Sequence, residues 1–343
     1  MMNLSKEYSV ESYNYEFDES LIAKKPIYPK ESAKLLIYYR ESKKIIHSTF
    51  GDIFQYLPKD ISILFNNTKV IKARIFGQKT SGGKIEVLIN RPLNSDKISI
   101  FVKGKVRVGT KISFAENLDL DILELISDGS RVGKFSQFGK TISFSELIVI
   151  IDKIGHIPLP PYISRDDDIA DEVDYQTVFA KKSGAVASPT ASLHFSENML
   201  KELESRFQTA YLTLHVGAGT FKPVDVEDIR EHKLHKEIFQ ISDKAKNIID
   251  SQSKILAVGT TVTRTIEYYF RTSEIDGEAD IFLHPNSKPQ RVNYLLTNFH
   301  LPKSTLLMLV SSFIGIDEMQ RIYKDAVKNR YKFYSYGDAM LII

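Results

Sequence analysis

The chain has 343 residues, 43% apolar and 26% charged, which is typical of a folded globular protein of roughly two domains. It contains no cysteine, which excludes disulfides, thiolate nucleophiles, Fe–S clusters and cysteine-ligated zinc. The longest apolar stretch is too short to span a bilayer, and the N-terminus lacks a signal-peptide pattern. We therefore expect a cytoplasmic protein without membrane association.

The net charge is only +3, but the charges are unevenly distributed. Between Lys69 and Lys111 there are eleven Lys and Arg residues and two acids, and between Phe114 and Asp128 there are five acids and no base. A basic block in a near-neutral protein indicates a polyanionic partner. From charge alone, a solvated strand surface explains the block equally well.

The N-terminal part predicts a short helix over 17–23 and buried strands over 34–39 and 62–65. From residue 73 the pattern changes to short alternating strands with glycine turns, which predicts a small β-barrel. Ser143 and Glu146 have the spacing of a capping box, so a helix over 144–153 is expected to close this block.

Beyond the proline-rich segment 157–162, which excludes a helix, helices and strands alternate. The expected fold is an α/β main domain with a barrel-like sheet, formed by residues 1–72 and 154–343 and interrupted by an inserted all-β barrel over 73–153. The later predicted strands are 211–216, 254–258 and 281–283, and the predicted helices are 196–207, 242–252, 262–271, 304–313 and 317–331.

Two apolar strands end in loops that carry glycine and threonine. After the first, His215 and Thr220 flank a Gly217-Ala218-Gly219 loop, in which glycine lets the backbone approach a ligand. This loop lacks the third glycine of the dinucleotide fingerprint, so an ordinary tight turn is the alternative.

The second strand ends at Gly259-Thr260-Thr261, just before a predicted helix that carries Arg264. Free amides at a helix start favour an anionic group such as a carboxylate. The alternative is that one of the threonines only caps the helix.

Several histidines are candidates for proton transfer. His194 and His300 each lie in a loop close to a predicted helix, although a satisfied, half-buried histidine is the commoner case. His232 and His235 would share a face if their segment were helical, but no third ligand accompanies them, so we expect no metal site.

The C-terminal segment carries three tyrosines beside Lys332, which could stack on bases or belong to the core. Asp338 follows them.

Taken in order, these motifs resemble the S-adenosylmethionine:tRNA ribosyltransferase-isomerase family of queuosine biosynthesis proteins. The resemblance runs from about residue 15 to the C-terminus. Asn67 stands where the family usually has Asp, Lys72 where it has Pro, and Ser192 where it has Gly; His284-Pro285-Asn286 replaces a Tyr-Pro-Gly-like turn. The segments that carry the resemblance are 65–74, 175–180, 184–195, 213–221, 257–261, 297–309 and 333–341.

The resemblance implies an unusual use of S-adenosylmethionine, in which the ribosyl group is transferred and the methyl group is not. The acceptor is 7-aminomethyl-7-deazaguanine at the wobble position of tRNA, and adenine and methionine leave as epoxyqueuosine-tRNA forms. S-adenosylmethionine is then a co-substrate, and no permanently bound cofactor or metal is expected. We also expect a monomer.

On this basis we assign three groups of residues. The candidate catalytic residues are His194, His215, His300 and Asp338. The candidate S-adenosylmethionine-binding residues are Gly217, Gly219, Thr220, Gly259, Thr260, Thr261 and Arg264. The candidate tRNA phosphate contacts are Lys69, Arg74, Lys103, Lys105 and Arg107.

Two other functions remain open at this point. A methyltransferase that uses the same co-substrate is disfavoured by the missing glycine fingerprint. A non-catalytic RNA-binding module would leave the polar, glycine-rich loops unexplained.

Overall fold

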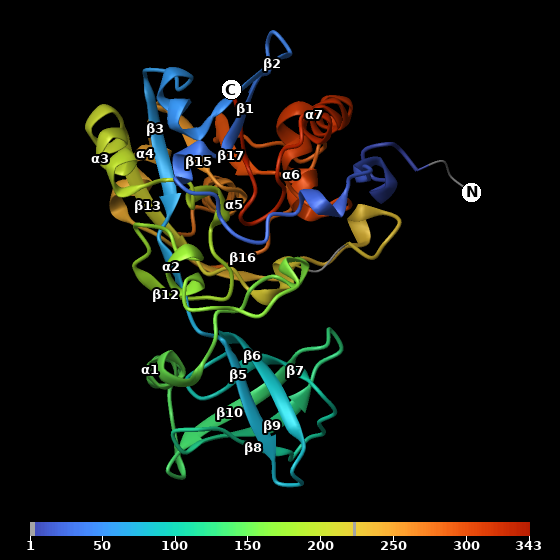
Figure 1. Ribbon diagram of the computed structural model, residues 1–343, viewed down its shortest axis with the longest axis vertical. Helices are drawn as coiled ribbons and strands as arrows, with labels where there is room; N and C mark the ends of the chain where they lie inside the picture. Colours follow the sequence, from blue (N-terminus) through green and yellow to red (C-terminus); the bar gives the residue numbers. More distant parts are fainter. Residues whose placement is uncertain (1–3, 222–223) are drawn as a thin grey trace.

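The computed structural model describes residues 4–221 and 224–343. A mixed α/β body lies at one end and a small β-barrel at the other (Figure 1). Among the helices of the described residues, none is long and apolar enough to cross a membrane.

The α/β body is built on a nine-stranded sheet with the order β16-β14-β13-β3-β15-β17-β18-β1-β2. The neighbours β13, β3, β15 and β17 are parallel, so their carboxyl ends meet at one edge, where β18 also begins. The bounds are β1 Lys34–Tyr39, β2 Lys44–Thr49, β3 Ile61–Asn66, β13 Gln208–Leu214, β14 Glu237–Ile241, β15 Lys254–Val258, β16 Asp276–Ala279, β17 Tyr294–Asn298 and β18 Ala339–Ile342.

Two details of this sheet differ from the prediction. The pairings of the described residues leave β16 and β2 as edges, so the sheet is open and not barrel-like. Segment 281–283 is not a strand, because β16 ends at Ala279 and the next residues form a loop.

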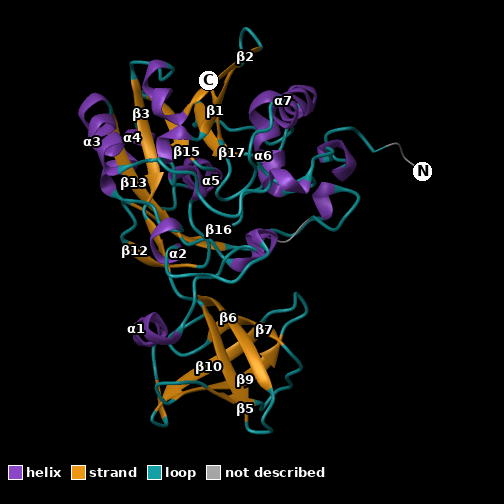
Figure 2. Ribbon diagram, viewed as in Figure 1, coloured by secondary structure: helices purple, strands orange, loops and turns teal. Residues whose placement is uncertain are grey.

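The predicted helices of the α/β body are present and lie on both sides of the sheet (Figure 2). Serine side chains cap three of them, since Ser196, Ser242 and Ser304 each accept a hydrogen bond from an amide of the first turn. The bounds are α2 Asp171–Asp174, α3 Glu197–Arg206, α4 Asp243–Asp250, α5 Thr260–Thr272, α6 Thr305–Ile314 and α7 Ile316–Lys328.

Short 3-10 helices fill several loops of the chain. The helix expected over 17–23 is one of these, and it spans only Glu19–Leu21. The full set is η1 Val10–Tyr13, η2 Glu19–Leu21, η3 Lys30–Ser32, η4 Phe50–Gln55, η5 Pro161–Ile163, η6 Thr190–Ser192, η7 Ala218–Phe221 and η8 Ile229–Glu231.

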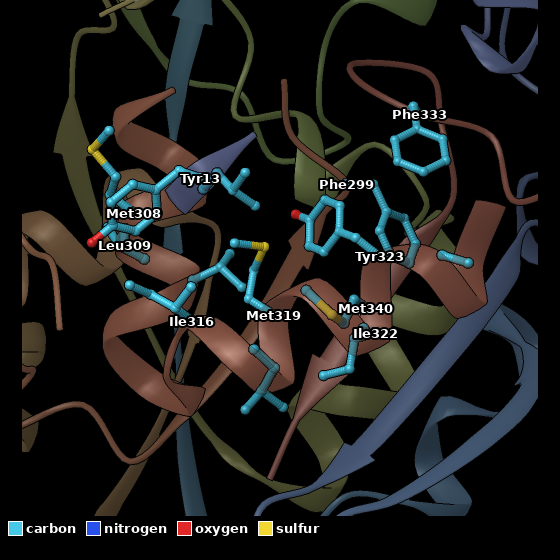
Figure 3. Packing of buried hydrophobic residues seen from close by; sticks show 14 of the residues in the cluster. Tyr13, Phe299, Met308, Leu309, Ile316, Met319, Ile322, Tyr323, Phe333 and Met340 are labelled. Atoms are coloured by element: carbon cyan, nitrogen blue, oxygen red, sulfur yellow. The ribbon is translucent and has the colours of Figure 1, made fainter. Parts of the chain in front are cut away.

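The largest core cluster packs α6 and α7 against the β18 side of the sheet (Figure 3). Phe299, Tyr323 and Phe333 are fully buried there, with ring centroids 5.2–6.3 Å apart. The C-terminal tyrosines Tyr331, Tyr334 and Tyr336 are at most 5% exposed. They are buried, so they present no ring on the outer surface for stacking on nucleic-acid bases, although Tyr334 lines one of the cavities described below.

The β-barrel is a closed ring of six antiparallel strands, because β10 pairs with β9 as well as with β7. Alternation places Ile85, Val87 and Ile89 of β6 inside. The bounds are β5 Arg74–Lys79, β6 Lys84–Pro92, β7 Ile98–Lys103, β8 Lys111–Ser113, β9 Leu118–Leu125 and β10 Arg131–Gln137, with β11 Lys140–Thr141 added to β10.

Helix α1, Phe144–Ile154, packs on the barrel through Leu147 and Ile151, and the predicted capping box of Ser143 and Glu146 is present. The exact division of the chain at residues 73 and 153 stays a prediction.

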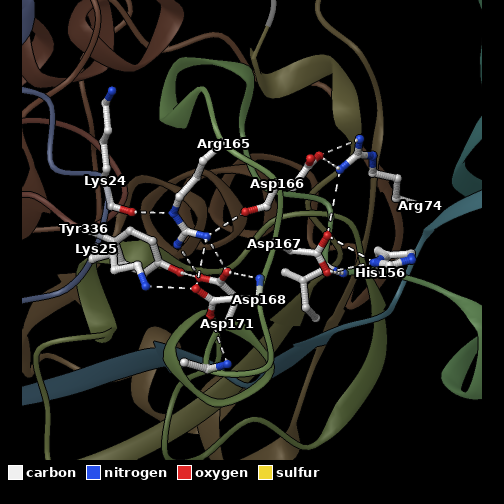
Figure 4. Close-up of polar contacts among 12 residues, drawn as sticks. Lys24, Lys25, Arg74, His156, Arg165, Asp166, Asp167, Asp168, Asp171 and Tyr336 are labelled. Carbon is white, nitrogen blue, oxygen red and sulfur yellow. Dashed lines mark hydrogen bonds and ion pairs between the residues drawn. The ribbon is translucent and has the colours of Figure 1, made fainter.

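A polar cluster connects the segment after α1 to the α/β body and to the β-barrel (Figure 4). Arg74 contacts Glu86 at 3.0 Å and Asp166 at 3.3 Å. Asp171 binds Arg165 at 2.6 Å and accepts a hydrogen bond from the Tyr336 hydroxyl at 2.8 Å. Nearby, β4 (Thr68–Val70) pairs in parallel with β12 (Lys182–Ala185), next to the sheet edge described above.

Candidate active site

Two adjoining cavities lie where the parallel strands of the main sheet end. The larger, about 730 Å³, lies between that edge and the barrel, and the smaller, about 310 Å³, lies against the start of α5. Leu306 lines both cavities, and the consecutive residues Val216 and Gly217 line one each. Ligand sites in open α/β sheets typically lie at this edge. The predicted loops therefore meet at one edge, but they line two cavities instead of one pocket.

His215 follows the last residue of β13 and lines the larger cavity. Its Nδ1 atom lies 2.7 Å from the hydroxyl of Thr68, and Gly184 passes so close that a Cβ there would lie 2.9 Å from the ring. Burial and the charge of Lys182 lower the pKa of His215 to about 4. The ring is therefore neutral at neutral pH and able to accept a proton.

The residues after β3 hold this histidine in place. The Asn66 side chain accepts hydrogen bonds from the amides of Leu214 (3.0 Å) and Thr68 (3.1 Å) and donates to the Leu214 carbonyl (2.9 Å). Asn67 accepts a hydrogen bond from the Thr213 hydroxyl at 2.7 Å, a role that an amide fills as well as a carboxylate.

The glycine loop after His215 is enclosed from two sides. The Ala218 amide donates to Asn90 of the barrel strand β6 at 3.0 Å. On the other side a Cβ at Gly219 would lie 2.3 Å from the His235 ring, so a larger residue at this position requires the ring or the loop to shift. Gly217 and Gly219 line the larger cavity. Thr220 lies in η7, but its side chain is outside the described part of the structure.

Arg264 also reaches the larger cavity. Its Nη1 group donates to Glu237, which is 4% exposed, and its Nε group donates to the Ile281 carbonyl at 3.3 Å. Its Nη2 atom is buried and has no hydrogen-bond partner among the described residues. A cationic donor is therefore available to a ligand beside the glycine loop.

The smaller cavity begins at Gly259, which has a φ of 99° and is the N-cap of α5. Thr260 and Thr261 line this cavity and are nearly buried. No side chain among the described residues caps the helix, so neither threonine acts as the cap, and the first amides of α5 have no acceptor within this part of the chain. Helix starts of this kind favour anionic groups.

His300 lines the smaller cavity, with Nε2 at 2.7 Å from the Thr297 hydroxyl. Burial lowers its pKa to about 3, so it is neutral. Four further lining residues carry buried polar atoms without a partner among the described residues: Tyr175 Oη, Ser188 Oγ, Asn298 Nδ2 and Tyr334 Oη.

Two predicted catalytic residues line neither cavity. His194 packs its ring against Phe50 at 4.9 Å, and burial lowers its pKa to about 4. Asp338 accepts hydrogen bonds from the amides of Lys34 (2.7 Å) and Lys332 (2.6 Å), while burial raises its pKa. Neither side chain is therefore placed at the two cavities, and their predicted catalytic role gains no support from this geometry.

The predicted tRNA contacts fall into two groups. Lys69, Lys103, Lys105 and Arg107 are exposed. Lys103 is the last residue of β7, roughly 13 Å along that strand from Ser99, which lines the larger cavity, and Lys105 and Arg107 follow the strand. Arg74, in contrast, is held by the carboxylates of Glu86 and Asp166.

His232 and His235 do not share a helix face, because η8 ends at Glu231 and a loop follows. Both line the larger cavity. Within residues 4–221 and 224–343, no group of three or more His, Cys, Asp or Glu side chains could hold a metal ion.

Several residues of the site were not predicted from the sequence. Ser188 and Asn298 lie inside the segments that carry the family resemblance, so the resemblance indicates them. Glu237 was not among the predicted site residues. Asn90 lies in an ordinary strand of the barrel, and nothing in the sequence indicates that it contacts a loop far along the chain.

A sequence profile of the family described as "Queuosine biosynthesis protein" matches residues 10–342. An S-adenosylmethionine:tRNA ribosyltransferase-isomerase of Aliarcobacter butzleri is 59% identical over 332 residues, covering 97% of this chain and 98% of that protein. One from Sulfurimonas denitrificans is 56% identical over 340 residues, covering 99% of both chains.

A similar solved structure is the S-adenosylmethionine tRNA ribosyltransferase of Thermotoga maritima. It is 30% identical, has a TM-score of 0.53, and the match covers 97% of this chain and all of that one. The predicted resemblance is thus confirmed over nearly the whole length. The chain belongs to the family of queuosine biosynthesis proteins, the S-adenosylmethionine:tRNA ribosyltransferase-isomerases.

Proposed function

We propose that the two cavities bind S-adenosylmethionine and the wobble nucleotide of tRNA for the reaction of this family. The chain transfers and isomerises the ribosyl group of S-adenosylmethionine onto 7-aminomethyl-7-deazaguanine in tRNA, which yields epoxyqueuosine-tRNA, adenine and methionine. The observation that carries the proposal is the meeting of His215, the glycine loop and the start of α5 at one edge of the sheet.

His215 is the proposed base. The positive sulfur of S-adenosylmethionine acidifies the hydrogens of the adjoining C5′ carbon, and a neutral histidine can remove one of them. Between His215 and His194 we choose His215, because it lines a cavity whereas His194 is packed against Phe50. The electrons of the C5′–sulfur bond later leave with methionine, and adenine leaves with a proton.

The co-substrate is proposed to extend across both cavities. Its carboxylate would lie at the amides of Thr260 and Thr261, where the helix start favours an anion. Its ribose would then lie near Gly217, Gly219 and His215, which line the larger cavity. Arg264 Nη2 supplies a further donor there. This arrangement needs no permanently bound cofactor.

The barrel is proposed to hold the tRNA. It borders the larger cavity, and it carries the exposed Lys103, Lys105 and Arg107. Side chains of this kind contact phosphates and give affinity without reading sequence. We also propose that the barrel over residues 73–153 is an inserted domain, that the protein acts in the cytoplasm and that it acts as a monomer.

The products test the function. With S-adenosylmethionine and tRNA that carries the precursor base, we expect free adenine and a mass increase of the tRNA. Release of S-adenosylhomocysteine would instead identify a methyltransferase. Equilibrium binding of tRNA without any turnover would identify a binding module.

A further inference from the structure

The smaller cavity has an unusual combination of features. Of the residues that line it, none is an Asp, Glu, Lys or Arg, and its one histidine is neutral. Four of its polar atoms are nonetheless buried without a partner among the described residues: Tyr175 Oη, Ser188 Oγ, Asn298 Nδ2 and Tyr334 Oη. Buried polar groups are normally hydrogen-bonded, so four of them on one cavity indicate a ligand that supplies the missing partners.

The geometry shows what these groups can offer. Asn298 Oδ1 accepts a hydrogen bond from the Thr190 hydroxyl at 2.8 Å, which leaves the amide group of Asn298 as a donor. Burial raises the pKa of Tyr334, so its hydroxyl stays protonated and can donate. With the uncapped first amides of α5, the cavity presents several donors and no carboxylate.

A surplus of donors at a helix start favours a carboxylate. The lack of cationic side chains disfavours a phosphate, whose charge would be left without compensation. An α-amino acid head combines one negative and one positive charge, and hydroxyls such as those of Ser188 and Thr260 can also accept from its ammonium group.

We infer that the smaller cavity is a subsite for the α-amino acid head of S-adenosylmethionine, with Ser188, Asn298 and Tyr334 as the residues that select its carboxylate. This inference rests on the proposed function and adds to it, because the same subsite would bind free methionine, the product. Methionine should therefore compete with S-adenosylmethionine.

The test uses free L-methionine, its analogue without the carboxylate, 3-(methylthio)propylamine, and adenine, titrated calorimetrically into the full-length protein. We expect methionine to bind and to compete with S-adenosylmethionine, and the analogue to bind at least tenfold more weakly. S188A and Y334F should each weaken methionine binding about tenfold, because hydrogen bonds to a charged group are strong. Adenine binding should change less than twofold.

Ser192 provides a matched control. Its hydroxyl is also fully buried and without a partner among the described residues, but it lines neither cavity. Removing any of these unpaired hydroxyls should leave the free protein as stable or slightly more stable. S192A should therefore match S188A in thermal stability and match the unchanged protein in methionine affinity.

The inference is overturned if methionine does not compete with S-adenosylmethionine. It is also overturned if S188A and Y334F weaken the binding of adenine and leave the affinity for methionine unchanged. The second outcome would assign the cavity to the nucleobase. Either result would leave the proposed function intact as long as the unchanged protein releases adenine and modifies tRNA. Absence of that turnover would refute the function independently of methionine binding.

Discussion

The hydroxyl of Thr68 lies 2.7 Å from Nδ1 of His215, although the two residues are 147 positions apart in the chain. The contact joins the start of β4 to the residue after β13, and Asn66 at the end of β3 adds to this connection through its hydrogen bonds to Leu214. It leaves Nε2 as the ring nitrogen that can act on a substrate. The proposed base is therefore oriented before any ligand binds.

Replacing His215 by glutamine should lower turnover about 10²- to 10⁴-fold, the usual contribution of a general base. S-adenosylmethionine affinity should change little, since the ring is proposed to act on a proton. Single-turnover kinetics and equilibrium binding separate the two effects. His194→Ala serves as the comparison, and full turnover in both His194→Ala and His215→Ala would refute the proton-transfer assignment.

The same histidine predicts a pH dependence. Because the pKa of His215 is lowered to about 4, the ring stays neutral from pH 8 down to pH 5. The chemical step should therefore be flat over this range and slow only as the pH falls towards 4. Rapid-quench rates with saturating substrates measure this step. An inflection near pH 6.5, the ordinary value for histidine, would contradict the assigned environment.

Buried histidines should also make stability depend on pH. The pKa of His194 is lowered by burial to about 4, so between pH 6.5 and 4 the unfolded chain binds a proton that the folded chain does not. The contribution of His194 to the free energy of unfolding is then fully present above pH 6.5. Below pH 6.5 it falls by about 1.4 kcal/mol per pH unit.

Urea unfolding at pH 7, 6 and 5 measures this loss. In His194→Gln, the free energy of unfolding should depend less steeply on pH, by the equivalent of about one proton. Between pH 7 and 8 the variant and the unchanged protein should show the same dependence. An equal slope in both proteins at low pH would show that His194 does not titrate as its burial requires.

The contact between Gly219 and His235 predicts a rescue. Gly219→Ala should reduce activity at least tenfold, because its Cβ would lie 2.3 Å from the His235 ring and displace the loop. Adding His235→Ala should restore part of this loss by making room. Gly51→Ala is the control, since its nearest neighbours are 3.5 Å away. Strictly additive effects of the two changes would mean that the two side chains do not compete for space.

Affinity for tRNA should fall steeply with salt concentration. Neutralising Lys103, Lys105 and Arg107 together should reduce the slope of log affinity against log salt by roughly three, since each phosphate contact contributes about one. Arg74→Gln should instead lower stability, because it removes the ion pairs of Arg74 with Glu86 and Asp166. Filter binding between about 50 and 200 mM salt measures the slope. A slope that is unchanged in the triple variant would exclude this end of the barrel as the docking surface.

Local features of the fold could be predicted from the sequence because their causes are local. The capping box of Ser143 and Glu146 and the cap at Ser196 depend on neighbouring residues, and both are present. Alternation likewise predicted the barrel strands. Segment 281–283 has the apolar composition of a strand, but no neighbouring strand pairs with it, so it forms a loop.

The site could be predicted only in part. Parallel strands explain why the loops after β13 and β15 meet. The separation into two cavities depends on Leu306, which lines both of them, and on the consecutive residues Val216 and Gly217, which line one each. The role of Asn90 depends on how the barrel packs on the sheet, and the burial of His194 depends on Phe50. No local pattern encodes such long-range contacts.

The central step of the proposed mechanism is the removal of a proton from C5′ of S-adenosylmethionine by His215. The most direct measurement is mass spectrometry of the modified tRNA made from S-adenosylmethionine in which deuterium replaces both hydrogens of C5′. We predict a product that retains only one of the two deuterons, formed by the unchanged protein and almost absent with His215→Gln. Retention of both deuterons, or product formation by His215→Gln at the unchanged rate, would contradict the account.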